Sequence, residues 1–222
     1  MDKQTAEILH CIERGADELG LDLGVGVLPG LVAYIRLLMR WNGAYNLTSV
    51  RDPLEMARRH VLDCLAILPY LRGTRLLDLG TGAGLPGLIL AIARPEMECV
   101  LLDGNGKKTR FCTQAVMELA LPNVEILYIR AENYRPQAPF STITARAFGP
   151  LSALREHAGR LLAPGGCLLA MKGTRRELAR EMAGLQQGAE RRPEVVALGV
   201  PDLAAHRHLV ILERPSPKPA NT

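Results

Sequence analysis

The sequence predicts an α/β protein in which a helical extension precedes a seven-stranded, mostly parallel sheet with an antiparallel hairpin at one edge. Three observations support this prediction. Apolar residues in the first 72 positions recur at helical spacing. From residue 73 onward, short apolar runs alternate with helix-length segments, as in βαβ units. A glycine-rich turn, DLGTGAGLPG, joins the first of these runs to the first helix-length segment.

Length and composition fit a single globular core with an appendage. The chain has 222 residues, of which 48% are hydrophobic and 23% are charged. We expect a helical extension over residues 1–72 and a sheet domain over residues 73–214. The proline-rich residues 215–222 are expected to form a disordered tail.

The extension shows three stretches of helical periodicity. Their apolar positions are Ile8, Leu9, Ile12 and Leu19, then Leu31, Val32, Ile35, Leu38 and Met39, then Leu54, Val61, Leu62 and Leu65. Residues 24–30 and the stretch WNGAYNLTS at 41–49 interrupt this pattern with glycine, proline and asparagine. We therefore expect a small set of helices with two loops.

The sheet domain contains seven short apolar runs. They span residues 75–80, 98–103, 124–129, 141–145, 167–171, 194–198 and 208–213. Candidate helices span residues 86–94, 106–120, 150–162 and 174–186. Because no helix-length segment separates the last two runs, they should form the antiparallel hairpin.

The positive charge is unevenly distributed. The chain has 27 Lys and Arg residues against 23 Asp and Glu residues, a net charge of +4. Residues 1–30 hold two basic and six acidic side chains, so the remainder of the chain is distinctly basic. This distribution fits a polyanionic partner, with the acidic first helix facing away from it, and it fits a solvated mixed surface equally well.

Neither a membrane nor a metal is expected as a partner. The longest apolar stretches are far shorter than the roughly 18–20 residues that span a bilayer, and the N-terminal residues do not resemble a signal peptide. We therefore expect a cytoplasmic protein. The five cysteines are scattered, without CxxC spacing, which argues against a metal site or a disulfide framework. Nothing in the sequence suggests a dimer, so we expect a monomer.

The glycine-rich turn predicts a ligand loop, because glycine lets the backbone approach a ligand closely. It can be read as Gly80-x-Gly82-x-Gly84 or as Gly82-x-Gly84-x-x-Gly87, and the second reading matches the dinucleotide fingerprint. Asp78 would repel a pyrophosphate but attract the cationic groups of S-adenosylmethionine. The charge therefore favours S-adenosylmethionine, while a nicotinamide-dependent oxidoreductase remains the alternative.

Further polar residues follow the other strands. Asp103 ends the second strand, where a carboxylate can bind the ribose hydroxyls of either cofactor. Ala131 and Glu132 follow the third strand, and Arg146 follows the fourth. Since ligands bind at the carboxyl ends of the strands in open α/β sheets, we expect these residues around one crevice.

Several motifs in this order resemble the bacterial small-subunit ribosomal RNA guanine-N7 methyltransferases, also called glucose-inhibited division protein B. The motifs are WNGAYNLTS, RRHVLDCL, LLDLGTGAGLPG, LLDGNGKKTRF, TARAF, MKG and RHLV. The resemblance extends over roughly residues 28–213. It implies a class I S-adenosylmethionine-dependent methyltransferase with a Rossmann-like sheet. It also implies methylation of one guanine in a loop of 16S rRNA near the decoding site.

The resemblance also implies site residues. Those carried over for the cofactor are Gly80, Leu85, Asp103, Ala131, Glu132 and Arg146, beside the Asp78, Gly82 and Gly84 of the loop itself. Cys64 and Gly104 stand where the family often has serine.

Methylation at guanine N7 needs no general base, because N7 carries a free lone pair. We therefore expect Arg146 and Lys172 to act by positioning the base. An arginine fork on guanine normally covers O6 and N7, so basic side chains should here contact O6 or phosphates instead. The RNA-binding candidates are Asn46, His60, Lys107, Lys108, Lys172, Arg207 and His208.

Structural alternatives stand beside these roles. Asn46 could cap a turn, His60 could pack against the sheet domain through Asp63, and Lys107 and Lys108 could lie on a solvated helix face. The partner is expected to be 16S rRNA or the small ribosomal subunit. A non-catalytic RNA-binding assembly factor is a further functional alternative.

Overall fold

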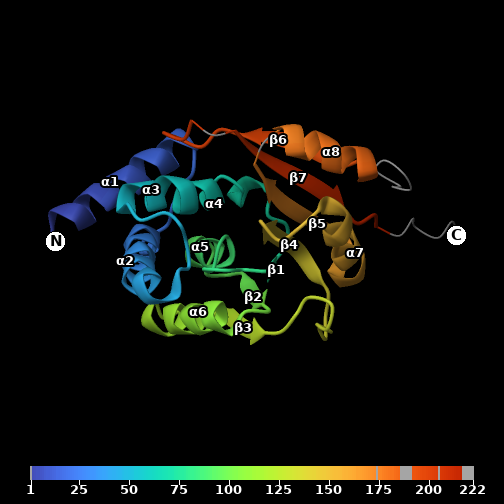
Figure 1. Cartoon of the computed structure of the whole chain (residues 1–222), viewed down its shortest axis with the longest axis horizontal. Helices are drawn as coiled ribbons and strands as arrows, with labels where there is room; N and C mark the ends of the chain where they lie inside the picture. The colour runs from blue at the N-terminus through green and yellow to red at the C-terminus, as the bar shows by residue number, and fades with distance from the viewer. Residues whose placement is uncertain (1, 174, 186–191, 205, 217–222) are drawn as a thin grey trace, which may run out of the picture.

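The computed structural model describes residues 2–173, 175–185, 192–204 and 206–216. At its centre lies a seven-stranded sheet in the order β3-β2-β1-β4-β5-β7-β6 (Figure 1). The strands are β1 (Arg75–Leu79), β2 (Glu98–Asp103), β3 (Val124–Tyr128), β4 (Phe140–Arg146), β5 (Leu162–Lys172), β6 (Glu194–Leu198) and β7 (Arg207–Glu213). All run parallel except β7, which is antiparallel to both β5 and β6.

The predicted fold class and edge hairpin are confirmed. The structure adds the order within the hairpin. It is β7, the second strand of the hairpin, that pairs with β5, so β6 forms the edge of the sheet. This arrangement brings the start of β7 beside the carboxyl end of β5, one strand away from that of β4.

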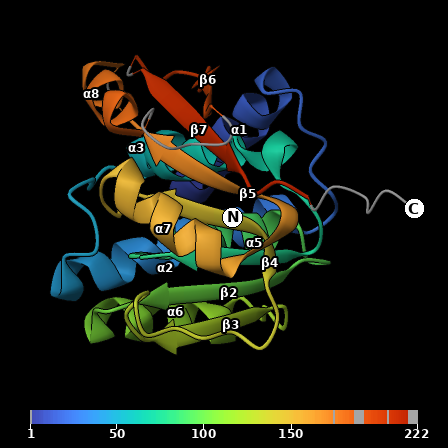
Figure 2. The same cartoon turned by 90° about the vertical axis from the view of Figure 1, so that its right-hand side faces the viewer.

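Helices cover both faces of the sheet. On one face lie α5 (Gly87–Ala93) and α6 (Gly106–Glu118), and on the other lie α7 (Leu151–Leu161) and α8 (Arg175–Leu185) (Figure 1). Figure 2 shows α7 lying across the strands, which stack from β3 to β7 behind it. These four helices match the predicted segments closely, although residues 174 and 186 lie outside the described residues.

The extension is helical throughout most of its length, as its periodicity predicts. It comprises α1 (Lys3–Glu18), α2 (Val27–Tyr45), α3 (Pro53–Met56), a π-helical segment (Ala57–Leu62), α4 (Asp63–Leu65) and a 3₁₀ turn (Leu68–Tyr70). The Asp2 carboxylate caps α1 by accepting a hydrogen bond from the Thr5 amide at 2.8 Å. The π-helical segment was not predicted, because the sequence ARRHVL shows ordinary helical spacing.

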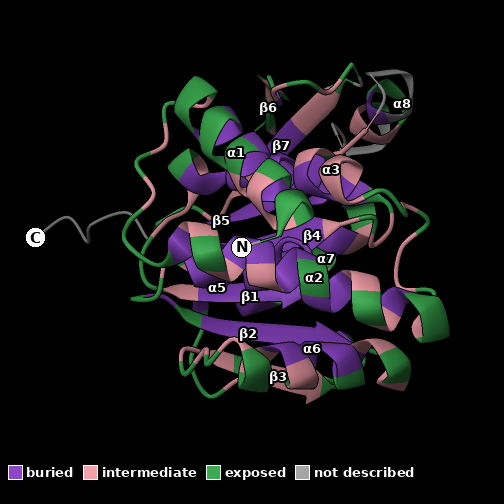
Figure 3. Cartoon of the chain, turned by 90° about the vertical axis from the view of Figure 1, so that its left-hand side faces the viewer, coloured by how far each residue is buried: buried purple, intermediate pink, exposed green. Residues whose placement is uncertain are grey.

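The extension and the sheet share one hydrophobic core. Ile35 and Leu38 of α2 belong to the same buried cluster as Leu88 and Ile89 of α5. Figure 3 shows the strands largely buried behind the helices of this side. A second cluster lies between the opposite face of the sheet and α7. The first 72 residues therefore cover one face of the sheet.

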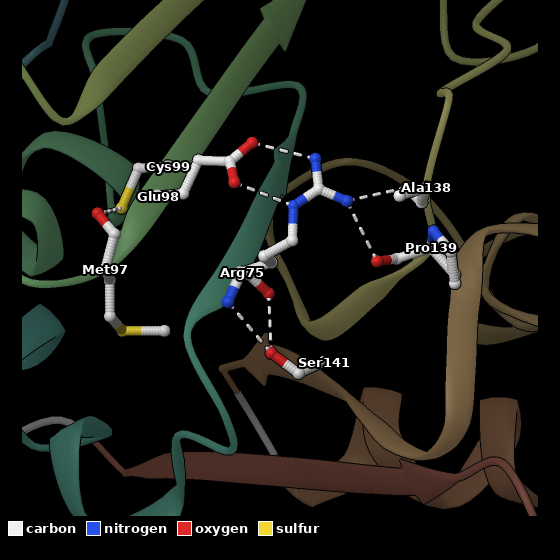
Figure 4. A network of polar contacts seen from close by, with 7 residues as sticks. All are labelled: Arg75, Met97, Glu98, Cys99, Ala138, Pro139 and Ser141. Carbon is white, nitrogen blue, oxygen red and sulfur yellow. Dashed lines mark hydrogen bonds and ion pairs between the residues drawn. The ribbon is translucent and has the colours of Figure 1, made fainter.

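An ion-pair network lies at the amino ends of β1 and β2 (Figure 4). The Arg75 guanidinium donates to both carboxylate oxygens of Glu98, at 2.8 and 2.9 Å. It also donates to the carbonyl oxygens of Ala138 and Pro139, before β4. This network joins β1, β2 and the start of β4.

Two further expectations concern the chain as a whole. None of the described helices combines the length and apolarity that crossing a bilayer requires. All five cysteines are reduced and buried. Of the predicted disordered tail, residues 217–222 lie outside the described residues.

Candidate functional site

The glycine-rich turn lies at the carboxyl end of β1 and leads into α5. Gly80, Gly82 and Gly84 all have positive φ, at 66°, 60° and 79°. A Cβ atom at Gly80 would lie 2.3 Å from the Phe148 ring, and one at Gly84 would lie 2.2 Å from Leu88 Cδ1. At Gly82 the nearest atom would be 3.9 Å away. Gly82 therefore borders open space, which is where a ligand can approach the backbone.

Asp103, at the end of β2, lies beside this turn. Its Oδ2 accepts a hydrogen bond from the Gly82 amide at 2.9 Å, and its Oδ1 accepts one from the Asn105 amide at 2.8 Å. The residue is 8% exposed. Each carboxylate oxygen has a further lone pair, so the group can still accept hydrogen bonds from a ligand.

Asp78 lies underneath the turn and is fully buried. Its Oδ2 accepts a hydrogen bond from the Gly87 amide at 3.0 Å, and its Oδ1 accepts one from the Thr144 hydroxyl at 2.9 Å. Burial raises the pKa of this carboxyl to about 6. Asp78 thus connects the turn to α5 and β4, and its charge reaches a ligand only across the loop backbone.

The extension supports the same turn from outside the sheet. The Tyr34 hydroxyl of α2 is buried and donates a hydrogen bond to the Ala83 carbonyl at 2.7 Å. The sequence analysis missed this residue, because a tyrosine on the apolar side of a helix is indistinguishable from an ordinary core residue.

A cavity of about 440 Å³ opens one strand away, at the ends of β4 and β5 and the start of β7. Four predicted site residues line it together: Arg146, Lys172, Arg207 and His208. Asp63 and Glu181 also line it. The antiparallel direction of β7 explains this convergence, because it places Arg207 and His208 opposite the end of β5.

Arg146 points from β4 toward the extension. Its Nη2 donates to the Arg59 carbonyl at 3.0 Å and lies 3.6 Å from Asp63 Oδ2. Arg207 approaches the same carboxylate, with Nε at 3.1 Å from Asp63 Oδ1. Asp63 is 2% exposed, and burial raises its pKa against the opposing effect of the two arginines.

Lys172 and His208 have partners on the other side of the cavity. The Lys172 ammonium donates to the Gly149 carbonyl at 2.7 Å and to Glu181 Oε2 at 2.8 Å. His208 Nδ1 lies 2.9 Å from the Gly173 carbonyl. Because a carbonyl only accepts, Nδ1 is the donor in this contact.

His60 is buried in the π-helical segment, and its partner is not the Asp63 considered above. Its Nε2 lies 2.8 Å from the Thr48 hydroxyl, and its Nδ1 lies 3.4 Å from Arg146 Nη2. Burial, followed by the charge of Arg146, lowers the pKa of His60 to about 4. The ring is therefore neutral at physiological pH and faces the interior.

The remaining predicted residues are more dispersed. Asn46 ends α2 with a φ of 49°, and its Oδ1 accepts a hydrogen bond from Arg51 at 3.1 Å. Lys107 and Lys108 begin α6, at the same edge of the sheet as the glycine-rich turn. Ala131 is buried after β3, and Glu132 beside it is exposed.

A mostly parallel seven-stranded sheet with this glycine turn after β1 and a carboxylate ending β2 defines a class I S-adenosylmethionine-dependent methyltransferase fold. Solved structures agree with this class. A putative O-methyltransferase from Klebsiella pneumoniae matches with a TM-score of 0.58 at 14% identity, covering 82% of this chain and 90% of the other. Aeropyrum pernix fibrillarin, solved with bound S-adenosylmethionine, gives 0.54 at 18% identity, covering 68% and 72%.

Sequence relatives are far more similar. The family model described as rRNA small subunit methyltransferase G matches residues 27–210, and the chain belongs to this family. The small-subunit rRNA methyltransferase G of Alkalilimnicola ehrlichii is 47% identical over 209 residues, 94% of each chain. That of Nitrosococcus oceani is 49% identical over 203 residues, 91% of this chain and 94% of its own.

Membership confirms an rRNA methyltransferase that uses S-adenosylmethionine, and it does not favour the nicotinamide-dependent oxidoreductase. Within the described part of the chain, no cluster of three or more His, Cys, Asp or Glu side chains is arranged to hold a metal ion.

Proposed function

We propose that the protein transfers a methyl group to N7 of a guanine in a 16S rRNA loop near the decoding site. The names of the relatives support the small-subunit rRNA as substrate. The observation that carries the choice of a guanine is the cavity beside the glycine-rich turn. Two guanidiniums, those of Arg146 and Arg207, line it beside Lys172, which is paired with Glu181, and guanidinium donors suit the carbonyl oxygen O6.

The glycine-rich turn fits S-adenosylmethionine. Bound there, it supplies an electrophilic methyl group on a sulfonium. Open space at Gly82 admits a ligand against the backbone, and the Asp103 carboxylate faces the position of a ribose. We assign cofactor contacts to Gly80, Gly84 and Leu85 of the turn, to Ala131 and Glu132 after β3, and to Arg146.

The residues around the cavity fit a reaction without a general base. His60, which contacts Arg146, is buried, and its lowered pKa of about 4 makes it a weak base. Lys172 is occupied by Glu181 and Gly149. Guanine N7 has its own lone pair, so the side chains need only hold the base in line with the methyl group, and alignment of this kind can supply most of the rate.

We assign rRNA phosphate contacts to the cationic start of α6. Within the described residues, neither Lys107 nor Lys108 forms an ion pair, and Lys107 is exposed. Asn46 and His208 would complete the RNA-binding edge. The enzyme would act as a monomer in the cytoplasm, where its ribosomal substrate is found. Replacing either lysine with glutamine should lower the slope of the logarithm of the RNA-binding constant against the logarithm of salt concentration by about one.

The decisive experiment replaces the acceptor atom. Small subunits are reconstituted with 16S rRNA in which 7-deazaguanine replaces guanine, and transfer of labelled methyl groups is measured. Inosine substitution serves as the matched control, since inosine keeps N7 and O6 and lacks only the 2-amino group. We expect transfer to inosine-containing subunits and none to 7-deazaguanine. Transfer to 7-deazaguanine would disprove N7 as the acceptor.

The same assay with naked 16S rRNA and with intact subunits identifies the substrate state. Mapping the labelled nucleotide tests its position in the loop near the decoding site.

A further inference from the structure

A single buried carboxylate joins the helical extension to the proposed acceptor cavity. Asp63 begins α4, directly after the π-helical segment, and its side chain is 2% exposed. It lines the cavity together with Arg146 and Arg207. The extension therefore contributes a charged group to a site whose other charged residues belong to the sheet domain.

The two arginines that contact Asp63 come from strands that are not neighbours. Arg146 ends β4 and Arg207 begins β7, and β5 lies between them. Adjacent strands lie about 4.8 Å apart. The strand backbones that carry Arg146 and Arg207 are therefore separated by roughly 10 Å. Asp63 approaches both, with Oδ1 at 3.1 Å from Arg207 Nε and Oδ2 at 3.6 Å from Arg146 Nη2.

Arg146 is further oriented by the segment that carries Asp63. Its Nη2 donates to the Arg59 carbonyl at 3.0 Å, and its Nη1 lies 3.8 Å from Cys64 Sγ. π-Helical turns are frequently found at functional sites. Here the wider turn presents Arg59, His60 and Asp63 to one guanidinium.

Part of the Arg207 guanidinium remains available to a ligand. Arg207 uses Nε for Asp63 and Nη1 for the His206 carbonyl at 3.4 Å. Its Nη2 has no hydrogen-bond partner in the described part of the chain, and its side chain is 19% exposed. A guanidinium has five N–H donors in a rigid plane, so fixing one edge also fixes the direction of the other.

We propose that Asp63 is a positioning residue that sets the spacing and direction of the Arg146 and Arg207 guanidiniums toward the acceptor base. The proposal rests on the proposed function. Asp63 itself does not touch the base. Its carboxylate holds the inner edges of both arginines, and their outer N–H groups then bind oxygen atoms of the guanine nucleotide. The contribution we assign to Asp63 is geometric; removal of one partner of a buried ion pair also lowers stability, so turnover and cofactor binding are compared in the same variant.

The main test is the isosteric variant Asp63→Asn, which removes the charge and one acceptor. We expect kcat with small subunits to fall about 100-fold, the size of effect that a displacement of about 1 Å produces. The loss of S-adenosylhomocysteine affinity, measured by calorimetry, should be far smaller than the loss of kcat, because Asp63 does not contact the glycine-rich turn and Arg146 is only one of the assigned cofactor contacts. The matched control is Glu98→Gln, which removes a similar ion pair at the amino ends of the strands. Its kcat should match that of the wild type.

A double-mutant cycle tests whether Asp63 acts through the arginine. Arg207→Lys keeps the charge but lacks the rigid fork, and it should reduce kcat as Asp63→Asn does. The double variant, Asp63→Asn with Arg207→Lys, should have a kcat little lower than either single variant, because both substitutions disturb the same guanidinium orientation. If Asp63→Asn does not fold, Arg207→Lys alone still tests the idea through its kcat and its binding of S-adenosylhomocysteine.

Three results would overturn the proposal. These are wild-type kcat in Asp63→Asn, parallel losses of cofactor binding and turnover, and additive effects of the two substitutions. In each case the 7-deazaguanine experiment on the wild type is unaffected, so failure of this inference is distinguishable from failure of the proposed function.

Discussion

At the scale of single residues, the three glycines after β1 have different physical reasons for being glycine. All three have positive φ, which costs other residues roughly 1–2 kcal/mol. Gly84 and Gly80 also lie against Leu88 and Phe148, whereas Gly82 borders open space. Gly80 and Gly84 are therefore needed for packing, whereas Gly82 is needed for the approach of a ligand.

Gly82→Ala and Gly84→Ala should separate these two roles. Gly82→Ala should lower the free energy of unfolding by about 1–2 kcal/mol, but weaken S-adenosylhomocysteine binding strongly, because the new methyl group points to the ligand. Gly84→Ala should cost about 2–5 kcal/mol of stability, since Leu88 is fully buried and has little room to move. Urea unfolding and calorimetry measure the two effects. Equal affinities in both variants would contradict this assignment.

His60 makes a pH-dependent contribution to stability. Its pKa in the folded protein is about 4, below the ordinary value of 6.5. Between these values the unfolded chain binds a proton that the folded protein does not, so the stabilisation is complete above pH 6.5 and is lost as the pH falls toward 4.

The prediction concerns the difference between the wild type and His60→Gln. Lowering the pH from 7.5 to 5 should reduce the wild-type free energy of unfolding by about 2 kcal/mol more than that of the variant. Urea unfolding of both proteins at pH 7.5 and pH 5 measures this difference in the free energy of unfolding. Identical pH dependence in the two proteins would show that His60 does not titrate with a lowered pKa.

At the scale of elements, α2 of the extension contacts the glycine-rich turn. Its Tyr34 hydroxyl donates to the Ala83 carbonyl inside the protein, and its ring packs edge-on against Phe111 of α6, with centroids 6.3 Å apart. One side chain thus connects the extension, the turn and the helix after β2.

Tyr34→Phe removes only this hydrogen bond and keeps the ring packing. We expect a loss of about 1–2 kcal/mol in the free energy of unfolding, because the buried Ala83 carbonyl loses its donor. The affinity for S-adenosylhomocysteine should also fall, since the turn is less firmly held. Thermal unfolding with and without S-adenosylhomocysteine tests both effects. A normal ligand-induced shift in melting temperature would argue against support of the turn by α2.

Elements differ in how far the sequence predicts them. The strands were predictable as short apolar runs that alternate with helix-length segments, and some of these runs end at a charged residue, such as Asp103 and Arg146. The π-helical segment was not, because its residues carry no local signal for a wider turn. The role of Asp63 was equally hidden, since Arg207 lies 144 residues further along the chain and only the fold brings the two together.

At the scale of the whole molecule, the predicted boundary near residue 72 separates helices from strands along the chain but does not divide the core. Leu31, Ile35 and Leu38 of the extension share one buried cluster with Leu88, Ile89 and Ile92 of α5. The site is equally shared, because the extension supplies Tyr34, Asp63 and His60. The sequence motifs predicted residues that the structure brings around one cavity, among them Arg146, Lys172, Arg207 and His208. The motifs could not show that residues of the extension, such as Tyr34 and Asp63, hold the glycine-rich turn and the arginines in place.

A fragment comprising residues 73–222 should therefore fail to fold alone. Removing the extension would expose the buried face of α5, and the fragment should lack near-ultraviolet circular dichroism and bind no S-adenosylhomocysteine. Size-exclusion chromatography and circular dichroism beside the full chain measure this. A compact fragment that binds S-adenosylhomocysteine would show that the sheet domain is autonomous.

The buried cysteines give the folded chain a property of practical use. Burial raises the pKa of all five thiols, and the thiolate is the form that reacts with alkylating reagents. The native enzyme should therefore resist iodoacetamide, while each unfolded molecule should gain up to five carbamidomethyl groups. The thiols are distributed over the extension and both halves of the sheet. The mass added by iodoacetamide therefore reports how much of each molecule has unfolded.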